Sequence, residues 1–487
     1  MAVLAKPSSK GGARRPKESI RAVVRCCPGK GEKVMKVAGN QFELTRPKTT
    51  LTKKFKFAKV FDDAATNEAV YSQEISPQIT SSLRSRQSIT VVAFGARGTG
   101  KTRTMRAKEG VAMRAVDDVF DSIAGAADAM VSLSILMSAV TPPVTSTNTG
   151  KQFTHEVLLD GMLPGGESAE AYRGGLHVRE HPRTGFFVED LTELSASTRE
   201  ECRELLARGL ANCAAEEARI GTGPGAPLRI HCLVTLRVRA RAPDGEESCV
   251  DVQVLDLAGW VRDKPAPRGK GAPAPQAAIG EDMVVKAFLR IIGQLETLPE
   301  GHIPYRDSKM TRVVSPALGG AARCMLVMHV ACDVYEETEA MLALAAKFEK
   351  ISCAPAASTV NYPREVAARR DEAEALLRKL GRDPSGVRSK DFAIGAAVSD
   401  ELLRARDLLA AAELLERDAA AWEDVVARSA DFKADGGAAA TANRADRKPH
   451  RVTDVTEDED YAPCAPVSRT GSDGAVVAGR GGEGRGG

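Results

Sequence analysis

Apolar and polar residues alternate with a period of two along several stretches of the chain, which is the pattern of half-buried β-strands. Strands are therefore predicted over residues 20–25, 55–62, 232–238 and 250–255, and an uninterrupted apolar run predicts a fully buried strand over 324–330. The turn sequence Pro243-Asp244-Gly245 separates the third and fourth of these strands, so the two are expected to pair as a hairpin. A second hairpin is expected over 176–188, with its turn at Pro182 to Gly185.

Apolar residues recur at helical spacing in segments between these strands. Helices are predicted over 67–84, from the capping pair Ser197 and Glu200 through Leu210, and over 283–295. The stretch from Met130 to Gly175 has the composition of a loop, and we expect an expanded surface loop there. The alternation of strands and helices predicts an α/β sheet fold.

Two further helices are predicted near the C-terminal end, over 363–381 and 399–429. In the second, apolar residues recur at alternating four- and three-residue steps, at Leu408, Ala412, Leu415, Ala419, Trp422 and Val426. About three heptads is a minimal length for a coiled coil. The pattern is compatible with a homodimer through 399–429, or with a helix that packs on the preceding domain or on another protein.

Composition narrows the class of protein. The chain has 487 residues, of which 43% are hydrophobic and 27% charged, with a net charge of +3. This balance predicts no bulk attraction to nucleic acid and no membrane insertion. The ten cysteines form no C-x-x-C pair, so neither a zinc site nor a disulfide framework is indicated, and a reducing cytosolic compartment fits. The longest apolar run, Cys324 to Cys332, is too short to span a bilayer, and the N-terminus lacks the apolar core of a signal peptide.

The sequence G-A-R-G-T-G-K-T from Gly95 to Thr102 follows an apolar run over 88–94 and leads into a helix-compatible segment from Lys101. In this strand–loop–helix setting the spacing indicates a phosphate-binding loop. Its glycines let several backbone N–H groups converge on one anion, Lys101 would reach the β- and γ-phosphates, and Thr102 would offer its hydroxyl to Mg²⁺. The alternative is a glycine-rich turn that matches by chance.

Around this loop the chain resembles the kinesin motor domain. The resemblance rests on V-A-F-G-A-R-G-T-G-K-T-R-T-M ending at Met105, on L-D-L-A-G at 255–259, on H-I-P-Y-R-D-S-K-M-T-R at 302–312 and on L-G-G at 318–320. It implies a three-layer α/β P-loop NTPase motor domain, in which helices cover both faces of a central mixed sheet, followed by short α-helices and a disordered tail. It also implies ATP and Mg²⁺ as cofactors, microtubules (tubulin) as the partner, and a place in the cytoplasm on the cytoskeleton. An unrelated P-loop ATPase is the alternative, although Y-R-D-S-K-M-T-R has no reason to recur there.

The resemblance also implies the domain organisation. A disordered basic arm (1–17) precedes a motor domain (18–350) and a neck-linker-like segment (351–361). A helical region (362–430) and a disordered tail (431–487) follow.

The resemblance further assigns residues to the nucleotide site. Asp256 and Thr102 would hold the metal, Gly259 would present its N–H to the γ-phosphate, and Arg229 stands at the position of the catalytic switch I arginine. The Arg103 guanidinium would stack near the adenine, where the family has an aromatic residue or histidine. The full nucleotide-binding set is Arg25, Pro28, Gly95, Ala96, Arg97, Gly98, Thr99, Gly100, Lys101, Thr102 and Arg103.

Both switch sequences depart from the family pattern. Switch I is N-x-x-S-S-R-S-H in the family but P-G-A-P-L-R-I-H here, from Pro224 to His231, so the asparagine and all three serines are replaced. In switch II the family's S-E pair is Trp260-Val261, and Arg229 therefore lacks its acidic partner. This loss predicts slow hydrolysis and supports a second hypothesis, a non-motile scaffold that binds nucleotide and microtubules. A shifted alignment that lets Thr222 substitute is the competing interpretation.

The microtubule-binding face is expected on the basic loop over 265–277 and the elements around it. The basic residues assigned to this face are Arg262, Lys264, Arg268, Lys270, Lys286, Arg290, Lys309 and Arg312. Because the tubulin surface is acidic, such contacts would be electrostatic and weakened by salt. The alternative is a solvated face with no binding role.

Overall fold

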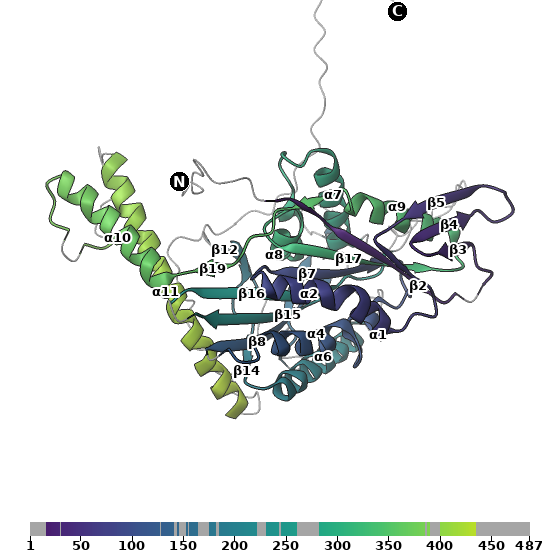
Figure 1. The fold of residues 1–487 in the computed structure, drawn as a ribbon, viewed down its shortest axis with the longest axis horizontal. Coiled ribbons are helices and arrows are strands. Elements are labelled where there is room, and N and C mark those ends of the chain that lie inside the picture. The colour runs from purple at the N-terminus through teal and green to yellow at the C-terminus, as the bar shows by residue number, and fades with distance from the viewer. Residues whose placement is uncertain are drawn as a thin grey trace, which may run out of the picture. The chain divides into compact units, whose positions relative to one another are not determined.

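The computed structural model describes residues 16–29, 31–126, 128–140, 144–145, 152–153, 155–163, 175–181, 185–221, 230–242, 245–260, 282–384, 387–389 and 400–434. Within them a mixed sheet of ten strands is flanked by helices, which confirms the predicted three-layer α/β fold (Figure 1). No helix in this part of the chain is both long and apolar enough to cross a lipid bilayer.

Parallel strands occupy the part of the sheet that carries the phosphate-binding loop. β7 (Ile89–Gly95) has β16 (Glu247–Asp256) on one side and β17 (Arg323–Ala331) on the other, and all three run parallel. Beyond β17 the sheet continues in parallel with β2 (Arg21–Cys27) and β6 (Lys59–Phe61). Because parallel neighbours end at the same edge of a sheet, β7 and β16 deliver their C-terminal residues to one place.

The other half of the sheet is antiparallel. β15 (Ile230–Arg241) pairs with β16 as the predicted hairpin and also with β8 (Ala129–Val140). β8 pairs in turn with β11 (Glu156–Asp160) and with β14 (Leu194–Ala196). The predicted hairpin over 176–188 is confirmed as β12 (Val178–His181) and β13 (Gly185–Val188), and a further short pair is β9 (Val144–Thr145) with β10 (Gln152–Phe153).

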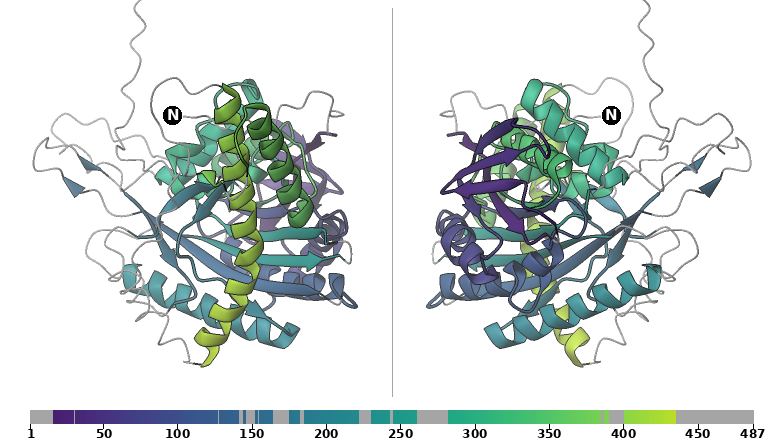
Figure 2. Two further views of the ribbon diagram at one scale, coloured as in Figure 1. Left: turned by 90° about the vertical axis from the view of Figure 1, so that its left-hand side faces the viewer. Right: turned by 90° about the vertical axis from the view of Figure 1, so that its right-hand side faces the viewer.

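Helices cover both faces of the sheet, with α7, α8 and α9 on one side and α2, α4 and α6 on the other (Figures 1 and 2). The first set is α7 (Met283–Thr297), α8 (Lys309–Val313) and α9 (Tyr335–Phe348), with short 3₁₀ turns at Tyr305–Asp307 and Ser315–Ala317. The second set is α1 (Asn67–Val70), a π-helical turn (Tyr71–Ile75), α2 (Ser76–Arg84), α3 (Lys101–Arg106), α4 (Val111–Ser122) and α6 (Arg199–Gly221). Pro316 lies in the second 3₁₀ turn, where the missing backbone donor is tolerated.

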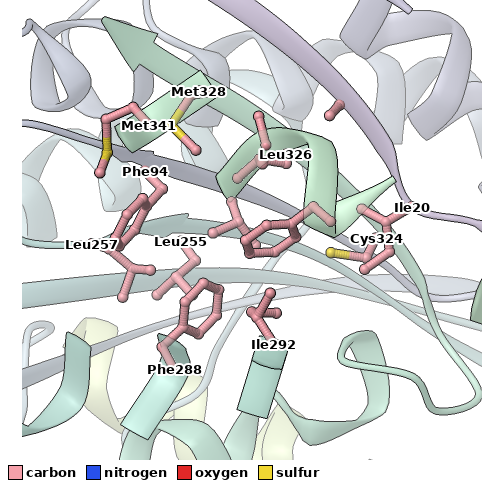
Figure 3. Close-up of a cluster of buried hydrophobic side chains, with 14 of the residues drawn as sticks. Ile20, Phe94, Leu255, Leu257, Phe288, Ile292, Cys324, Leu326, Met328 and Met341 are labelled. Carbon is pink, nitrogen blue, oxygen red and sulfur yellow. The ribbon is translucent and has the colours of Figure 1, made fainter. Parts of the chain in front are cut away.

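Two apolar layers hold the helices to the sheet. β7 alternates between them: Val92 and Phe94 belong to one, and Val91 and Ala93 to the other. On the first side Phe94 stacks on Phe288 of α7 with ring centroids 6.0 Å apart, within a cluster of leucine, isoleucine and methionine side chains (Figure 3). The strand before the phosphate-binding loop is thus fixed by packing on both faces.

The N-terminal strands differ from the prediction in one respect. The alternating run over 55–62 is not one strand, because the chain leaves the pairing at Phe57 and Ala58. β5 (Thr52–Lys56) belongs to a separate sheet with β3 (Met35–Ala38) and β4 (Gln41–Thr45), whereas β6 joins the main sheet. At the break the Phe57 N–H donates to Asn40 O at 3.1 Å and the Ala58 N–H to Glu349 Oε1 at 3.3 Å. Neither partner is visible in a local pattern.

The prediction of an expanded loop over 130–175 was wrong for two segments. Residues 130–140 form most of β8, which has strand partners on both sides, and residues 156–160 form β11 of the main sheet. Serines at 132, 134 and 138 break the apolar run and mislead a local reading. In the fold Ser132 Oγ donates to Glu193 at 2.5 Å and Ser138 Oγ to Glu156 at 2.8 Å, so these buried hydroxyls are satisfied.

Helix α6 runs to Gly221 and so exceeds its predicted end at Leu210. The predicted cap is displaced by one residue. Thr198 Oγ1 accepts from the Glu201 N–H at 3.1 Å, and Glu201 Oε2 accepts from the Ser197 N–H at 2.7 Å. The first contact is that of a capping box with Thr198 as the cap, whereas the returning contact from Glu201 goes to the residue before the cap.

The neck-linker-like segment pairs with strands of the main domain. β18 (Ser352–Cys353) pairs with β1 (Glu18–Ser19), and β19 (Thr359–Val360) pairs with β16. The two predicted helices are present as α10 (Tyr362–Lys379) and α11 (Asp400–Ala434), so α11 extends a few residues past its predicted end.

Helices α10 and α11 lie side by side as an antiparallel pair (Figures 1 and 2). Oppositely charged residues join them at Arg370–Glu416, Lys379–Glu401 and Arg404–Glu372. Ala412 and Leu415 of the predicted heptad pattern are buried within the single chain. Asp418 lies 3.3 Å from His181 of β12, so α11 also contacts the main domain. The described part of α11 thus packs in the way that the second interpretation of its pattern expected, and dimerisation stays a prediction.

Candidate functional site

The loop from Gly95 to Thr102 joins β7 to α3, as predicted. Gly95 has φ +151°, and a Cβ there would lie 2.2 Å from His329 O, so both the backbone and the neighbouring strand require glycine. Strand register places Ala93 of β7 opposite Asp256 at the end of β16. A cavity of about 360 Å³ opens where the two strands end. It is lined by Arg97, Gly98, Gly100, Lys101, Thr102, Arg103, Ile230, Asp256, Leu257, Ala258 and Gly259.

Lys101 is a buried cation whose partners belong to its own loop. Its side chain is 6% exposed, and Nζ donates to Gly95 O at 3.1 Å and to Ala96 O at 2.7 Å. Burial lowers the pKa of the ammonium, and the nearby Asp256 carboxylate opposes that shift. An anion in the cavity would compete with two neutral carbonyls for this ammonium and would offer it a stronger, charge-assisted contact.

Thr102 and Asp256 meet at the floor of the cavity. Thr102 Oγ1 donates to Asp256 Oδ2 at 2.8 Å, although 154 residues separate the two in the chain. The same oxygen accepts from Arg106 Nε at 2.8 Å, and Arg106 Nη2 donates to Glu217 of α6 at 2.7 Å. Thr102 and Arg106 are four residues apart on α3, so they project from the same face of the helix.

The surroundings of the other carboxylate oxygen, Asp256 Oδ1, indicate that these residues fit a magnesium ion. Asp256 is 3% exposed, and its Oδ1 is a buried atom with no hydrogen-bond partner. A buried carboxylate oxygen normally has a donor, and a metal-bound water is one that would satisfy it. Among the described residues no cluster of three or more histidine, cysteine or carboxylate side chains is placed to hold a metal. A site made of one hydroxyl, one carboxylate and substrate phosphates is the kind that Mg²⁺ uses.

The segment after β16 lies directly against the phosphate-binding loop. The Trp260 N–H donates to Gly95 O and the Arg97 N–H donates to Trp260 O, both at 3.0 Å. Gly259 passes so close that a Cβ there would lie 2.5 Å from Arg97 Cα. The L-D-L-A-G sequence and the loop are therefore joined by backbone contacts, and a change in either is transmitted to the other.

His231 links three elements next to the cavity. Its Nδ1 accepts from the Ala258 N–H at 3.1 Å, and its Nε2 lies 3.1 Å from Asp282 Oδ1. Asp282 Oδ1 also accepts from the Val284 and Val285 N–H groups and so caps α7. The histidine and the aspartate are fully buried. The beginning of β15, the turn after β16 and the first turn of α7 are thereby connected through polar groups.

The remaining predicted nucleotide residues fall into two groups. Arg97 and Arg103 are exposed and line the cavity, and Thr99 is buried, with its hydroxyl donating to Ala96 O at 2.7 Å. Arg25 does not line this cavity. Its guanidinium donates to Asn67 Oδ1 at 2.5 Å, to Thr104 Oγ1 at 2.6 Å and to Ala65 O at 3.1 Å. These contacts connect α3, which contains Thr104, to the start of α1. Pro28 is exposed and also lies outside the lining.

Four of the eight basic residues assigned to the microtubule face are described. Lys286 and Arg290 are exposed on α7, and Arg290 Nη1 lies 2.7 Å from Asp307 Oδ2. Arg312 is half-buried, and its Nη2 donates to Arg306 O at 3.4 Å. Lys309 is half-buried, with Nζ 3.5 Å from Leu176 O, and burial lowers its pKa. The residues outside the described part of the chain are Arg262, Lys264, Arg268, Lys270, Val261 and residues 222–229. The last range contains Thr222, Arg229 and all of switch I except Ile230 and His231.

Two arginines near these sites were not singled out from the sequence. Arg106 follows directly after the last residue of the T-R-T-M match, and its spacing of four from Thr102 was the available signal. Its partner Glu217 is 111 residues away, which no local pattern reveals. Arg306 belongs to the Y-R-D-S-K sequence and is exposed beside Glu180 of β12, at 3.1 Å.

Comparisons with known proteins agree on one family. A kinesin motor domain profile matches residues 15–351. The kinesin-like protein KIN-7N of Arabidopsis thaliana is 28% identical over 384 residues, which cover 74% of this chain and 43% of that protein. KIN-5A of the same plant is 26% identical over 76% of this chain and 34% of its own length. KIN-1 of Oryza sativa subsp. japonica is 26% identical over 56% of this chain and 54% of its own length.

The chain therefore spans about half, or less, of the length of these relatives. The solved structure of a fast kinesin superposes with a TM-score of 0.54 at 22% identity, covering 70% of this chain and 94% of the other. At that identity the likeness concerns the fold.

Proposed function

The chain belongs to the kinesin motor domain family, and from this premise we propose that it binds ATP with Mg²⁺ in the Gly95–Thr102 loop and attaches to microtubules in the cytoplasm. The observation that carries the proposal is the convergence of Lys101, Thr102 and Asp256 at one cavity where two parallel strands end. Lys101 supplies the cation for the phosphates. Thr102 and Asp256 would hold the metal, which when bound would neutralise phosphate charge.

Exposed arginines complete the nucleotide site. Arg103 follows Thr102 at the edge of the cavity, and its planar guanidinium can lie against the adenine ring. Arg97 stands at the opposite end of the loop and adds a second positive charge at the opening. Arg25 acts indirectly, since its guanidinium is bonded to Asn67, Thr104 and Ala65, and Pro28 does not line the cavity.

The proposed microtubule face is centred on α7 and the turn that follows it. Lys286, Arg290 and Arg306 are exposed there, and the basic residues Arg262, Lys264, Arg268 and Lys270 precede α7 in the chain. Lys309 contributes less, because its ammonium is half-buried against Leu176 O. Contacts of this kind act through charge and are screened by salt.

A second candidate function, a microtubule-associated protein that binds nucleotide and hydrolyses it slowly, is favoured by the two switch sequences. Pro227, Leu228 and Val261 cannot make the side-chain hydrogen bonds that the family's serines and glutamate make. Hydrolysis of this type depends on polar groups that position water and stabilise charge. Removing one such preorganised donor costs about 10²–10³ in rate, and several are replaced together.

The experiment that tests the proposal measures both ligands in one sample. Purified protein is sedimented with taxol-stabilised microtubules, in buffer without nucleotide and with ATP, ADP or a non-hydrolysable ATP analogue plus Mg²⁺. The proposal expects cosedimentation that changes with the nucleotide and falls as salt is raised. Binding to microtubules that ignores every nucleotide, or no binding at all, would contradict it.

A set of substitutions separates the two candidate functions. Val261→Glu restores a carboxylate for Arg229, and adding Pro227→Ser and Leu228→Ser restores hydroxyls. The slow-hydrolysis candidate expects little turnover from Val261→Glu alone and more from the triple variant. An equally high turnover in the unmodified protein and in all variants would favour an ordinary motor whose other residues do this work.

A further inference from the structure

Arg106 places a second buried cation beside the proposed metal-binding carboxylate. Its side chain is 8% exposed, and Nε lies 2.8 Å from Asp256 Oδ2. On its other side Nη2 lies 2.7 Å from Glu217 Oε1 of α6. The guanidinium is therefore held by two carboxylates from two elements, and its position is fixed independently of any ligand.

The charge of this arginine is secure. Burial opposes a charged guanidinium, but the electrostatic influence of Cys232, Asp256 and Glu217 outweighs it and raises the pKa of Arg106 above its ordinary value. Asp256 is therefore half of an ion pair before any ligand arrives. Only Oδ1 is left without a partner, because Oδ2 already accepts from Thr102 and Arg106.

We propose that Arg106 acts as a protein-supplied counter-cation for Asp256, so that nucleotide binding in this chain depends only weakly on Mg²⁺. The inference rests on the proposed nucleotide function of the same loop. The weak dependence on Mg²⁺ follows because the positive charge of Arg106 has opposite effects on nucleotide binding without and with the metal. Without metal, an isolated Asp256 carboxylate would repel the phosphates, and Arg106 cancels that repulsion. With metal, the neutralised Asp256 gives less attraction to the divalent cation than an isolated carboxylate would.

A purely structural role is the competing explanation. Arg106 ties α3 to β16 and to α6, and such a tie would contribute to stability whatever the ligand. The two roles differ in one observable quantity, the ratio of nucleotide dissociation constants measured in EDTA and in Mg²⁺. A structural tie changes stability and leaves that ratio alone, whereas a counter-cation changes the ratio.

The test measures this ratio by titrating a fluorescent ADP into the full chain, once with excess Mg²⁺ and once with excess EDTA. Four proteins are compared: the unmodified chain, Arg106→Met, Arg106→Lys and Lys108→Met. Lys108 is exposed two residues further along, so Lys108→Met removes an equal charge without touching Asp256. Glu217→Gln is added because it removes the other partner of Arg106 and leaves the contact with Asp256.

The unmodified protein is expected to lose less than about tenfold in affinity on chelation. In Arg106→Met the ratio is expected to rise by about tenfold or more, the size of one charge-assisted contact. Arg106→Lys, Lys108→Met and Glu217→Gln are expected to stay near the unmodified ratio. Thermal unfolding identifies any variant that does not fold.

Two results would overturn the inference. One is an unmodified protein whose affinity collapses on chelation, a result that needs no variant. The other is a folded Arg106→Met with the unmodified ratio. A protein that binds ADP in neither condition would instead refute the proposed nucleotide function, and this inference with it. The failures of the two ideas are therefore distinguishable.

Discussion

Replacing Lys101 with alanine separates the role of this residue in the fold from its role in binding. The ammonium is buried and donates to two carbonyls, but each carbonyl keeps another donor. Gly95 O still accepts from the Trp260 N–H at 3.0 Å, and Ala96 O still accepts from Thr99 Oγ1 at 2.7 Å. Removal also relieves the desolvation that lowers the pKa of Lys101. The free energy of unfolding should therefore change by no more than about 1 kcal/mol.

The effect on binding should be larger. A charge-assisted contact between an ammonium and a phosphate is worth about 1.5–3 kcal/mol, which corresponds to roughly a 10- to 150-fold change in the dissociation constant. Arg97 and Arg103 are exposed at the cavity opening and cannot replace a cation buried at its floor. Weaker binding with an unchanged fold is the expected signature.

The assay is titration of a fluorescent ADP in Mg²⁺, with thermal unfolding of the same samples. Lys108→Ala is the matched control, since it removes an exposed lysine seven residues along the chain. The reasoning is refuted if Lys101→Ala binds ADP as tightly as the unmodified protein, or if Lys108→Ala loses as much affinity.

Three further predictions concern the neighbouring elements. Gly259→Ala should weaken nucleotide binding by about tenfold or more, because its Cβ would lie 2.5 Å from Arg97 Cα; an unchanged affinity in the ADP titration would show that the two loops separate freely. Reversing Lys286 and Arg290 to Glu should abolish salt-sensitive cosedimentation with microtubules. The control reverses the exposed Lys36 and Lys56 to Glu, which changes the net charge by the same amount; equal loss in the control would argue against the proposed face. Burial is the main factor that lowers the pKa of His329 from its ordinary 6.5 to about 3. As pH falls below about 6.5 the unfolded chain binds a proton that the folded chain does not, so the free energy of unfolding should fall by up to about 1.4 kcal/mol per pH unit until pH 3. A His329→Gln variant that loses the same free energy of unfolding per pH unit, measured by urea unfolding, would contradict that assignment.

The phosphate-binding loop was predictable because its chemistry is local. The glycines, the preceding apolar strand and the following helix are contiguous in the sequence, and the structure reproduces each of them. The hairpin of β15 and β16 was predictable for the same reason, since its turn carries Pro243-Asp244-Gly245. Its position beside β7 then brought Asp256 to Thr102.

What local patterns missed depends on distant partners. β8 resembles a loop because its serines interrupt the apolar run, and the acceptors of Ser132 and Ser138, Glu193 and Glu156, lie elsewhere in the chain. The break after β5 depends on Asn40 and Glu349. The pairing of Arg106 with Glu217 and Asp256 likewise arises only once α3, α6 and β16 have come together.

The heptad-like pattern of α11 was correctly left open between two interpretations. An apolar stripe on a helix predicts that this face is buried but does not predict which surface covers it. In the described chain α10 supplies that surface, with Ala373 and Leu377 buried in the same region and three ion pairs between the helices.

The central claim is that the chain keeps the nucleotide-binding loop but has lost the polar switch residues that support hydrolysis. Microtubule-stimulated ATP hydrolysis tests this claim most directly. The steady-state rate is measured at saturating ATP and microtubules beside an intact kinesin motor. The account predicts a rate at least about 10²-fold lower than that of the intact motor, with ADP binding retained. Turnover of several ATP per second, equal to the intact motor and stimulated by microtubules, would contradict it.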